Sequence, residues 1–193
     1  TLGENGEWVR DMISAHKTGV NAVHWAPSVR ASSLLNQNVS AYEQNLRLVT
    51  GGCDKLVRVW VSKGAPGTEG RWTEEVTLEG HDDWVRDVQW APSIGLPINM
   101  IASGGQDGQV FIWTQRIASG SPQNVKLEWD SRVLEPKFED AVWRVSWSLT
   151  GNILAVSSGD NKVTLWKEGL DQIWKCISTV DEQTANSVDG TME

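Results

Sequence analysis

One block of sequence occurs three times in this 193-residue chain, and its internal spacing constrains the fold more than any other feature. The second copy is the best preserved, with His81, Val85, Val88 and Trp90. The matching sets are His16, Val20, Val23 and Trp25 in the first copy, and Phe138, Val142, Val145 and Trp147 in the third. Paired strands fix such offsets, whereas loops accept changes of length. We therefore predict three repeated β units.

Each unit continues into a second block that ends in tryptophan. The blocks read LVTGGCDKLVRVW, IASGGQDGQVFIW and LAVSSGDNKVTLW. Their last strands are apolar on both sides, which is typical of sheets covered on both faces. Alternating segments around Trp72, Trp129 and Trp174 follow them and are predicted to be outer strands. Long loops are predicted at residues 28–46, 62–71 and 115–124.

Four strands in each unit of about 40 to 60 residues, with no helical period, predict an all-β propeller. The chain begins with Thr1, partway through a unit, so we expect it to be a fragment. The expected divisions are 1–14 as the outer strand of a preceding blade, with the strand over 7–14; 15–79, 80–136 and 137–180 as three blades; and 181–193 as an acidic disordered tail.

The composition disfavours several classes of function. A formal net charge of -8 argues against a nucleic-acid binder, which concentrates Lys and Arg. Cys53 and Cys176 stand far apart and have no metal-ligand spacing. No apolar run approaches the roughly 20 residues needed to cross a bilayer, so we expect no direct membrane insertion. The 12 tryptophans are the unusual feature, and ten of them sit at recurring positions of the repeat.

A catalytic interpretation is disfavoured as well. Ser103, His81 and Asp107 are the residue types of a hydrolase triad, but similar residues recur around Asp54 and are lost around Asp160, whereas catalysis needs one site. The glycine pairs precede an aspartate and lead into strands, which favours turns over a phosphate cradle. We predict no enzymatic activity, no cofactor and no metal site.

The Gly80-His81 pair, Asp107 and Trp113 resemble the pattern of the WD-repeat family. The resemblance implies structural tetrads of His, Ser or Thr, Asp and Trp, namely His16, Thr50, Asp54 and Trp60, and His81, Ser103, Asp107 and Trp113. The third unit keeps a partial tetrad of Asp160 and Trp166, because Phe138 and Val156 replace its His and Ser. The chain departs from the family pattern in that none of its three units has Asp after the final Trp.

A closer resemblance, over residues 7 to about 180, is to the C-terminal half of the small WD-repeat subunits shared by the COPII outer coat and the nuclear-pore scaffold. It is carried by NAVHWAPS, TGGCDKLVRVW, GHDDWVRDVQWAPSIGLP, ASGGQDGQVFIW and VWRVSWSLTGNILAVSSGDNKVTLWKE. It implies an open six-bladed propeller, of which this chain holds about three four-stranded blades, so that the N-terminal half is required as well.

That resemblance also implies a non-enzymatic scaffold and a partner. The partner is an elongated helical protein that donates a blade, either a Sec thirty-one-like outer-coat subunit or a Y-complex nucleoporin of the nuclear pore. The implied locations are the cytoplasmic face of the endoplasmic reticulum, COPII vesicles and the nuclear pore complex. The sequence does not choose between the coat, the pore and a nutrient-signalling complex.

A second surface is suggested by aromatic and charged residues at the start of the first strands. Trp84, Arg86, Trp143 and Arg144 are predicted to form a protein-binding rim, with packing between blades as the alternative. An alternative function is a peptide-recognition adaptor such as a ubiquitin-ligase substrate receptor. It is weakened because Asn21, Arg86 and Trp143 share one offset but no chemistry.

Overall fold

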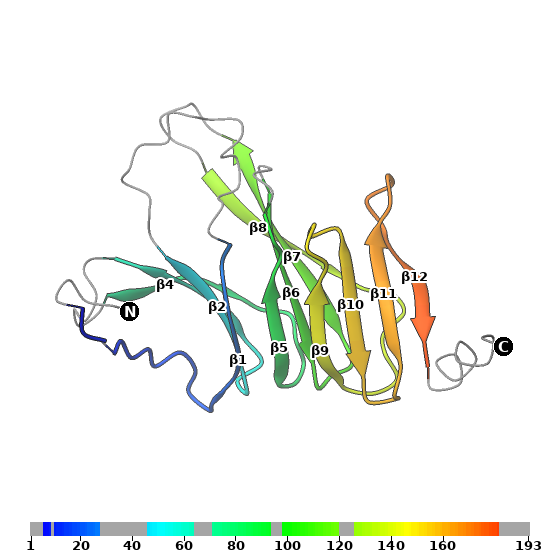
Figure 1. Ribbon diagram of the computed structural model, residues 1–193, viewed down its shortest axis with the longest axis horizontal. Helices are drawn as coiled ribbons and strands as arrows, with labels where there is room; N and C mark the ends of the chain where they lie inside the picture. Colours follow the sequence, from blue (N-terminus) through cyan, green and yellow to red (C-terminus); the bar gives the residue numbers. More distant parts are fainter. Residues whose placement is uncertain are drawn as a thin grey trace.

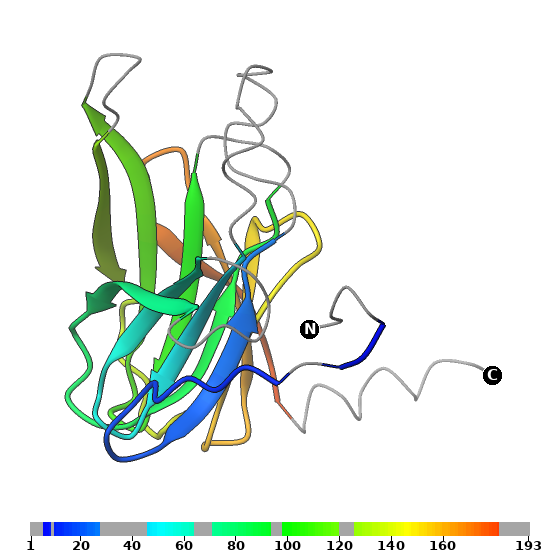
Figure 2. The same ribbon diagram turned by 90° about the vertical axis from the view of Figure 1, so that its left-hand side faces the viewer.

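The computed structural model describes residues 6–8, 10–27, 46–63, 71–93, 98–119 and 126–181. Within these residues all regular structure is β, in three four-stranded antiparallel sheets that lie side by side along the molecule (Figure 1). Figure 2 looks onto the side of the first sheet and shows the other two behind it. The all-β prediction with four strands in each unit is confirmed.

Each sheet is a meander in which every strand pairs with its neighbours in the chain. The first sheet contains β1 (Val20–Trp25), β2 (Arg47–Gly52), β3 (Val57–Ser62) and β4 (Trp72–Leu78). The second contains β5 (Val85–Trp90), β6 (Asn99–Gly105), β7 (Val110–Ser119) and β8 (Lys126–Val133). The third contains β9 (Val142–Trp147), β10 (Ile153–Ser158), β11 (Val163–Glu168) and β12 (Trp174–Val180).

Two sequence-based expectations are wrong in part. The strand expected over residues 7–14 is absent, because among these residues only Trp8 forms a bridge and residues 10–14 join no sheet. Residues 115–124 were expected to form a loop, but β7 continues to Ser119, which pairs with Lys126. The expected tail beyond Asp181, residues 28–45 and 64–70, and most of the APSIGLP run lie outside the described residues.

The core lies between successive sheets, where the inner strand of one sheet packs on the broad face of the sheet before it. Val85, Val88 and Trp90 of β5 form one apolar cluster with Val49 and Val59 of the first sheet. An equivalent cluster joins the second and third sheets; its members include Ala102, Val110, Ile112, Val142, Val145 and Trp147. The valine, valine and tryptophan spacing of the repeat is therefore the spacing of the side chains that enter the preceding sheet.

Two glycines allow this close approach. A Cβ added to Gly51 of β2 would lie 2.6 Å from Val85 Cγ1, and one added to Gly104 of β6 would lie 2.4 Å from Val142 Cγ1. Both distances are too short for real atoms, so a side chain at either position would push the sheets apart. The glycines are needed here for space.

The inner strand of the first sheet has no such neighbour among the described residues. Trp25 of β1 is 54% exposed, whereas the equivalent Trp90 and Trp147 are 1% and 8% exposed. Val20 and Val23 are exposed beside it. The same sequence pattern is therefore buried twice and exposed once, according to whether a sheet precedes it.

We expect Gly104→Ala to destabilise the protein by about 1–3 kcal/mol, the usual cost of overpacking a well-packed core. The matched control is Ser157→Ala, at the equivalent place in β10, where no following sheet packs among the described residues; a surface change of this kind alters stability by roughly 0.5 kcal/mol or less. Chemical denaturation of both variants measures the difference. Equal stabilities for the two variants would contradict the assigned packing.

Candidate protein-interaction site

The first polar network links four residues from β2, β3 and the segments that precede β1 and β3. His16 Nδ1 lies 2.6 Å from Asp54 Oδ1, and its Nε2 lies 2.8 Å from Thr50 Oγ1. The Thr50 hydroxyl accepts the indole N–H of Trp60 at 3.0 Å. When the proton is assigned to Nδ1 of the imidazole, the Trp60 indole donates to Thr50, the Thr50 hydroxyl donates to His16, and His16 donates to Asp54. The network thus joins the approach to β1 to the two middle strands of the sheet.

The second network has the same connections. His81 Nδ1 lies 3.0 Å from Asp107 Oδ2, and His81 Nε2 lies 2.8 Å from Ser103 Oγ, which accepts the Trp113 indole N–H at 2.8 Å. Burial acts to raise the pKa of Asp107, but hydrogen bonds from His81 and from the Gln109 backbone outweigh it and lower that pKa below its usual value. The Asp107 carboxylate is thus held in its charged form.

Ser103 is not accessible as a nucleophile. Its side chain is completely buried and its oxygen is already bonded to both His81 and Trp113. A catalytic serine needs an exposed oxygen beside a substrate site. In this structure the residues that resemble a triad hold neighbouring strands together.

The second of the two glycines that follow each network hydroxyl residue makes room for the imidazole. A Cβ on Gly52 would lie 2.3 Å from His16 Cγ, and one on Gly105 would lie 2.5 Å from His81 Nδ1. In the third sheet Ser158 stands at this position and Phe138 stands at the position of the histidine. The glycine and the histidine are thus replaced together.

The third sheet satisfies its remaining polar groups by a different route. The Ser158 hydroxyl donates to Asp160 Oδ1, the group that histidine contacts in the other sheets. The indole N–H of Trp166 is 2.8 Å from Thr164 Oγ1 on the same strand, so it is bonded although Val156 cannot accept it. Sequence comparison missed both partners. The signals were present in the change from GG to SS before Gly159 and in Thr164, two residues before the tryptophan.

Sequence reasoning also missed Arg58, which stands where Thr164 stands in the third sheet. Its Nη1 donates to Asp54 Oδ2 at 2.8 Å and to the Ala15 carbonyl at 2.9 Å. In the second sheet the same position is Phe111, whose ring stacks on Trp113 with centroids 5.1 Å apart. The residue two before the tryptophan therefore supports the network differently in each sheet.

The predicted rim is brought together at the junction of the second and third sheets. The Arg86 guanidinium lies over both tryptophan rings, 5.1 Å from the centroid of Trp84 and 4.7 Å from that of Trp143. Its Nε donates to Gln106 Oε1 at 2.8 Å. Both tryptophans remain about half exposed, so this rim packs between blades and also presents aromatic surface.

Arg144, the fourth predicted rim residue, does not join this stack. Its side chain is 81% exposed, and its Nη1 lies 3.9 Å from Asp87 Oδ1. Burial raises the pKa of Asp87, although the Val145 N–H and Arg144 act against that rise. Arg144 is therefore a loosely held cation beside the inner strands.

The rim residues owe their position to a bulge that recurs in all three inner strands. The pairing shifts between Val20 and Ala22, between Val85 and Asp87, and at the Ser157 and Ser158 partners of β9. The extra residues are Asn21, Arg86 and Trp143. A bulge re-aims the side chain that it inserts. Asn21 and Arg86 use this to contact the next sheet: Asn21 Nδ2 donates to the Val85 carbonyl at 2.8 Å.

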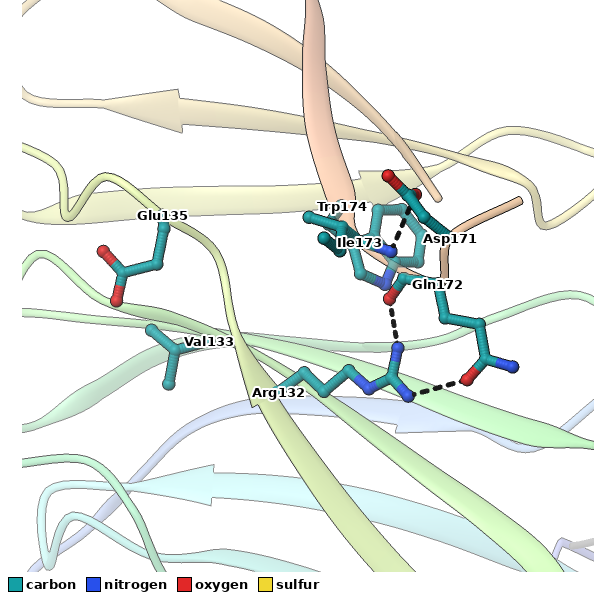
Figure 3. A pocket seen from close by; sticks show the side chains of 7 residues that line it. All are labelled: Arg132, Val133, Glu135, Asp171, Gln172, Ile173 and Trp174. Carbon is teal, nitrogen blue, oxygen red and sulfur yellow. Dashed lines mark hydrogen bonds between the residues drawn. The ribbon is translucent and has the colours of Figure 1, made fainter. Parts of the chain in front are cut away.

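A pocket of about 560 Å³ lies between the outer strand of the second sheet and the β11–β12 turn (Figure 3). It is lined by Arg132, Val133, Glu135, Asp171, Gln172, Ile173 and Trp174. The Arg132 guanidinium already donates to Gln172 Oε1 at 3.1 Å and to Glu168 Oε1 at 3.2 Å. Its donors thus link two blades, and we assign the pocket no ligand.

The broad face of the third sheet that points away from the second sheet is uncovered among the described residues, whereas the equivalent faces of the first two sheets are buried. We call it the open face; its residues are Arg144, Ser146, Ile153, Ala155, Ser157, Val163, Leu165, Lys167, Lys175, Ser178 and Val180. The equivalent residues of the second sheet, such as Ala102 and Ile112, are buried by the third. On the open face Val163 is 39% exposed.

The described residues hold no cluster of three or more His, Cys, Asp or Glu side chains that could bind a metal ion. They also include no helix of the length and apolar character needed to span a membrane.

Three successive four-stranded meanders, each packing its inner strand on the sheet before it, are blades of a β-propeller. The sequence profile described as "WD domain, G-beta repeat" matches residues 7–61, 72–114 and 131–167. The chain belongs to this WD-repeat family, in agreement with the resemblance noted in its sequence.

Comparison with individual curated proteins points to a smaller group of relatives within this family. The chain is 51% identical over 180 residues to "Protein SEC13 homolog" of Bos taurus, covering 92% of this chain and 52% of the relative. The chain is 51% identical over 185 residues to the Homo sapiens protein of the same name, covering 94% of this chain and 54% of the relative. "Protein transport protein SEC13" of Cryptococcus neoformans is 47% identical over 180 residues, covering 87% and 51%. The chain spans about half the length of the curated relatives it matches.

We expect His81→Ala to destabilise the protein far more than Phe138→Leu. The first change removes the imidazole that bonds both the Ser103 hydroxyl and the Asp107 carboxylate, and the loss of such a buried partner costs about 1–3 kcal/mol. The second changes an apolar side chain into a smaller one that leaves no polar group unsatisfied, at under about 1.5 kcal/mol. Denaturant unfolding of the two variants measures both losses, and equal losses would contradict the network.

Asp107 also predicts a dependence of stability on pH. Its pKa is lowered by folding, so its contribution is present above the unfolded value, about 3.9, and is lost as the pH falls through the folded value. The stability gap between wild type and Asp107→Asn should therefore be largest near neutral pH and shrink below about pH 4. The exposed Asp130→Asn is the control. A gap that does not change with pH would refute the assignment.

Proposed function

We propose that this chain is part of a non-enzymatic scaffold subunit of the COPII vesicle coat, acting in transport from the endoplasmic reticulum to the Golgi, and of the outer ring of the nuclear pore. Two relatives support a transport role through their printed name, "Protein transport protein SEC13". The subunit works at the cytoplasmic face of the endoplasmic reticulum, on COPII vesicles and at the nuclear pore. It requires the N-terminal half of the propeller, which covers β1.

The observation that carries the proposal is the open face beside β9–β12. Its equivalents in the first two sheets are buried by a following blade, while here apolar residues such as Val163 and Leu165 remain accessible. An elongated helical partner, an outer-coat subunit or a nuclear-pore scaffold protein, inserts a blade against this face. Packing a blade on this face removes apolar surface from water, which is the main driving force of most protein association.

Blade insertion explains why catalysis is not needed for this function. A coat or pore building block has to hold two chains at a fixed angle, and a blade packed on a rigid sheet buries enough apolar surface to do so. The polar networks contribute by fixing the strands of each blade. The partner binds the sheet rather than a small-molecule pocket.

The rim supports a second candidate, a peptide-recognition adaptor. Trp84 and Trp143 offer half-exposed rings beside Arg86, and such residues dominate many binding surfaces. This candidate places the partner at the rim and makes the open face dispensable.

We expect Val163→Glu in the full-length protein to reduce binding of the purified outer-coat partner at least tenfold, because a carboxylate would be buried in an apolar contact. Leu149→Glu, on an exposed turn outside the open face, is the matched control and should bind normally. Calorimetry measures both affinities, and thermal unfolding checks that each variant is folded.

The rim variant Trp84→Ala separates the two candidates. The scaffold predicts that it binds the outer-coat partner with unchanged affinity. Loss of binding in Trp84→Ala with normal binding by Val163→Glu would favour the adaptor and contradict the proposed scaffold.

A further inference from the structure

The open face differs from the two faces that hold a following blade, and the first difference concerns space. Gly51 pairs with Ala22, Gly104 pairs with Asp87 and Ser157 pairs with Arg144, so the three occupy equivalent positions. Both glycines lie under valines of the next inner strand, with no room for a Cβ. Ser157 has a Cβ and a hydroxyl in that place. An inner strand with valine at this position cannot approach β10 as β5 approaches β2.

The second difference concerns the hydrogen bonds between inner strands. The backbone N–H of Trp90 donates to His24 Nδ1 at 3.2 Å, and the N–H of Trp147 donates to Gln89 Oε1. His24 and Gln89 each stand just before the tryptophan of their own inner strand, and both reach the following blade. Ser146 stands at this position in β9, and its hydroxyl is two bonds closer to the backbone than the amide oxygen of Gln89.

The third difference is that a hydrogen-bond acceptor of the second sheet is replaced by a donor in the third. Asp87 Oδ2 accepts the N–H of Val145 at 3.0 Å, which ties the second blade to the third. The equivalent residue of β9 is Arg144, which only donates. In β1 the position is Ala22, so the arginine is specific to the last blade. The Arg144 guanidinium has one long contact, 3.9 Å from its Nη1 to Asp87 Oδ1, so most of its donors are free to bond an incoming strand. Once covered by a blade it needs a closer acceptor, because burying a poorly paired charge is costly.

We infer that the open face is matched to a strand of a different protein, with a small residue over Ser157 and a carboxylate facing Arg144, and is mismatched to a further WD-type blade. The inference rests on the proposed function and specifies the chemistry of its partner. A second copy of this chain would present Val20, Val23 and Trp25 of β1, the pattern that fits over a glycine. Ser157 takes the place of the glycine and Ser146 is too short to bond the next strand, so both disfavour a second copy of this chain. Arg144 favours a strand that carries a carboxylate.

The test compares the charge reversal Arg144→Glu with wild type in the full-length protein, using the purified outer-coat partner as the probe. We expect a loss of affinity of at least tenfold that is relieved when one Asp or Glu of the partner's inserted strand is changed to Lys. The matched control is Lys137→Glu, an exposed residue between β8 and β9 that carries the same change of charge and should bind normally.

The outcomes separate this inference from the proposed function. If Arg144→Glu binds normally while Val163→Glu does not, the partner uses the open face without an acidic contact, and the inference is wrong although the scaffold stands. If both variants bind normally, the scaffold proposal fails as well. If sedimentation shows that wild type self-associates through this face and that Arg144→Glu abolishes it, the occupant is a second copy and the inference is again overturned.

Discussion

The contact on which this structure depends is the entry of two valines and a tryptophan from one inner strand into the broad face of the preceding sheet. It occurs between the first and second sheets and again between the second and third. It requires Gly51 and Gly104, because any side chain there would collide with Val85 or Val142. The fixed offsets of the repeat follow from this one packing arrangement, since a shift of one residue in a strand would turn these side chains to the other face.

The polar networks act within blades, and the third blade shows that they are exchangeable as units. His16 and His81 connect a hydroxyl to a carboxylate, and each needs a neighbouring glycine to fit. Where Phe138 replaces the histidine, Ser158 supplies the bond to Asp160. Replacing a complete set of partners leaves no buried group unsatisfied, whereas removing one partner does. The apolar packing therefore recurs at both junctions between sheets, whereas the hydrogen-bonded groups inside each blade differ.

The sequence was sufficient to predict the class of fold, because the repeat offsets record which side chains point the same way. The members of both complete networks were implied by its resemblance to WD-repeat proteins. Thr164, Ser158 and Arg58 were missed because each acts in one blade only, so none of them belongs to the pattern that the three copies share. The strand expected at residues 7–14 did not form because no sheet among the described residues pairs with it. The repeat pattern does not show the open face, because Val163 has the same residue type as its buried equivalents Val57 and Val110. Only the resemblance, which implies a partner blade beside residues 142–179, pointed to this end of the chain.

The two ends of this row of blades are chemically different. The β1 end keeps Val20, Val23 and Trp25, the side chains that pack at both internal junctions, so it is complementary to a WD-type sheet with a glycine. The β9–β12 end keeps the apolar strands but replaces that glycine by Ser157 and the acceptor Asp87 by Arg144. Two blade surfaces pack together when valines of one lie over a glycine of the other. The β1 end carries the valines, but the β9–β12 end has Ser157 in place of the glycine, so the two described ends are not complementary to each other.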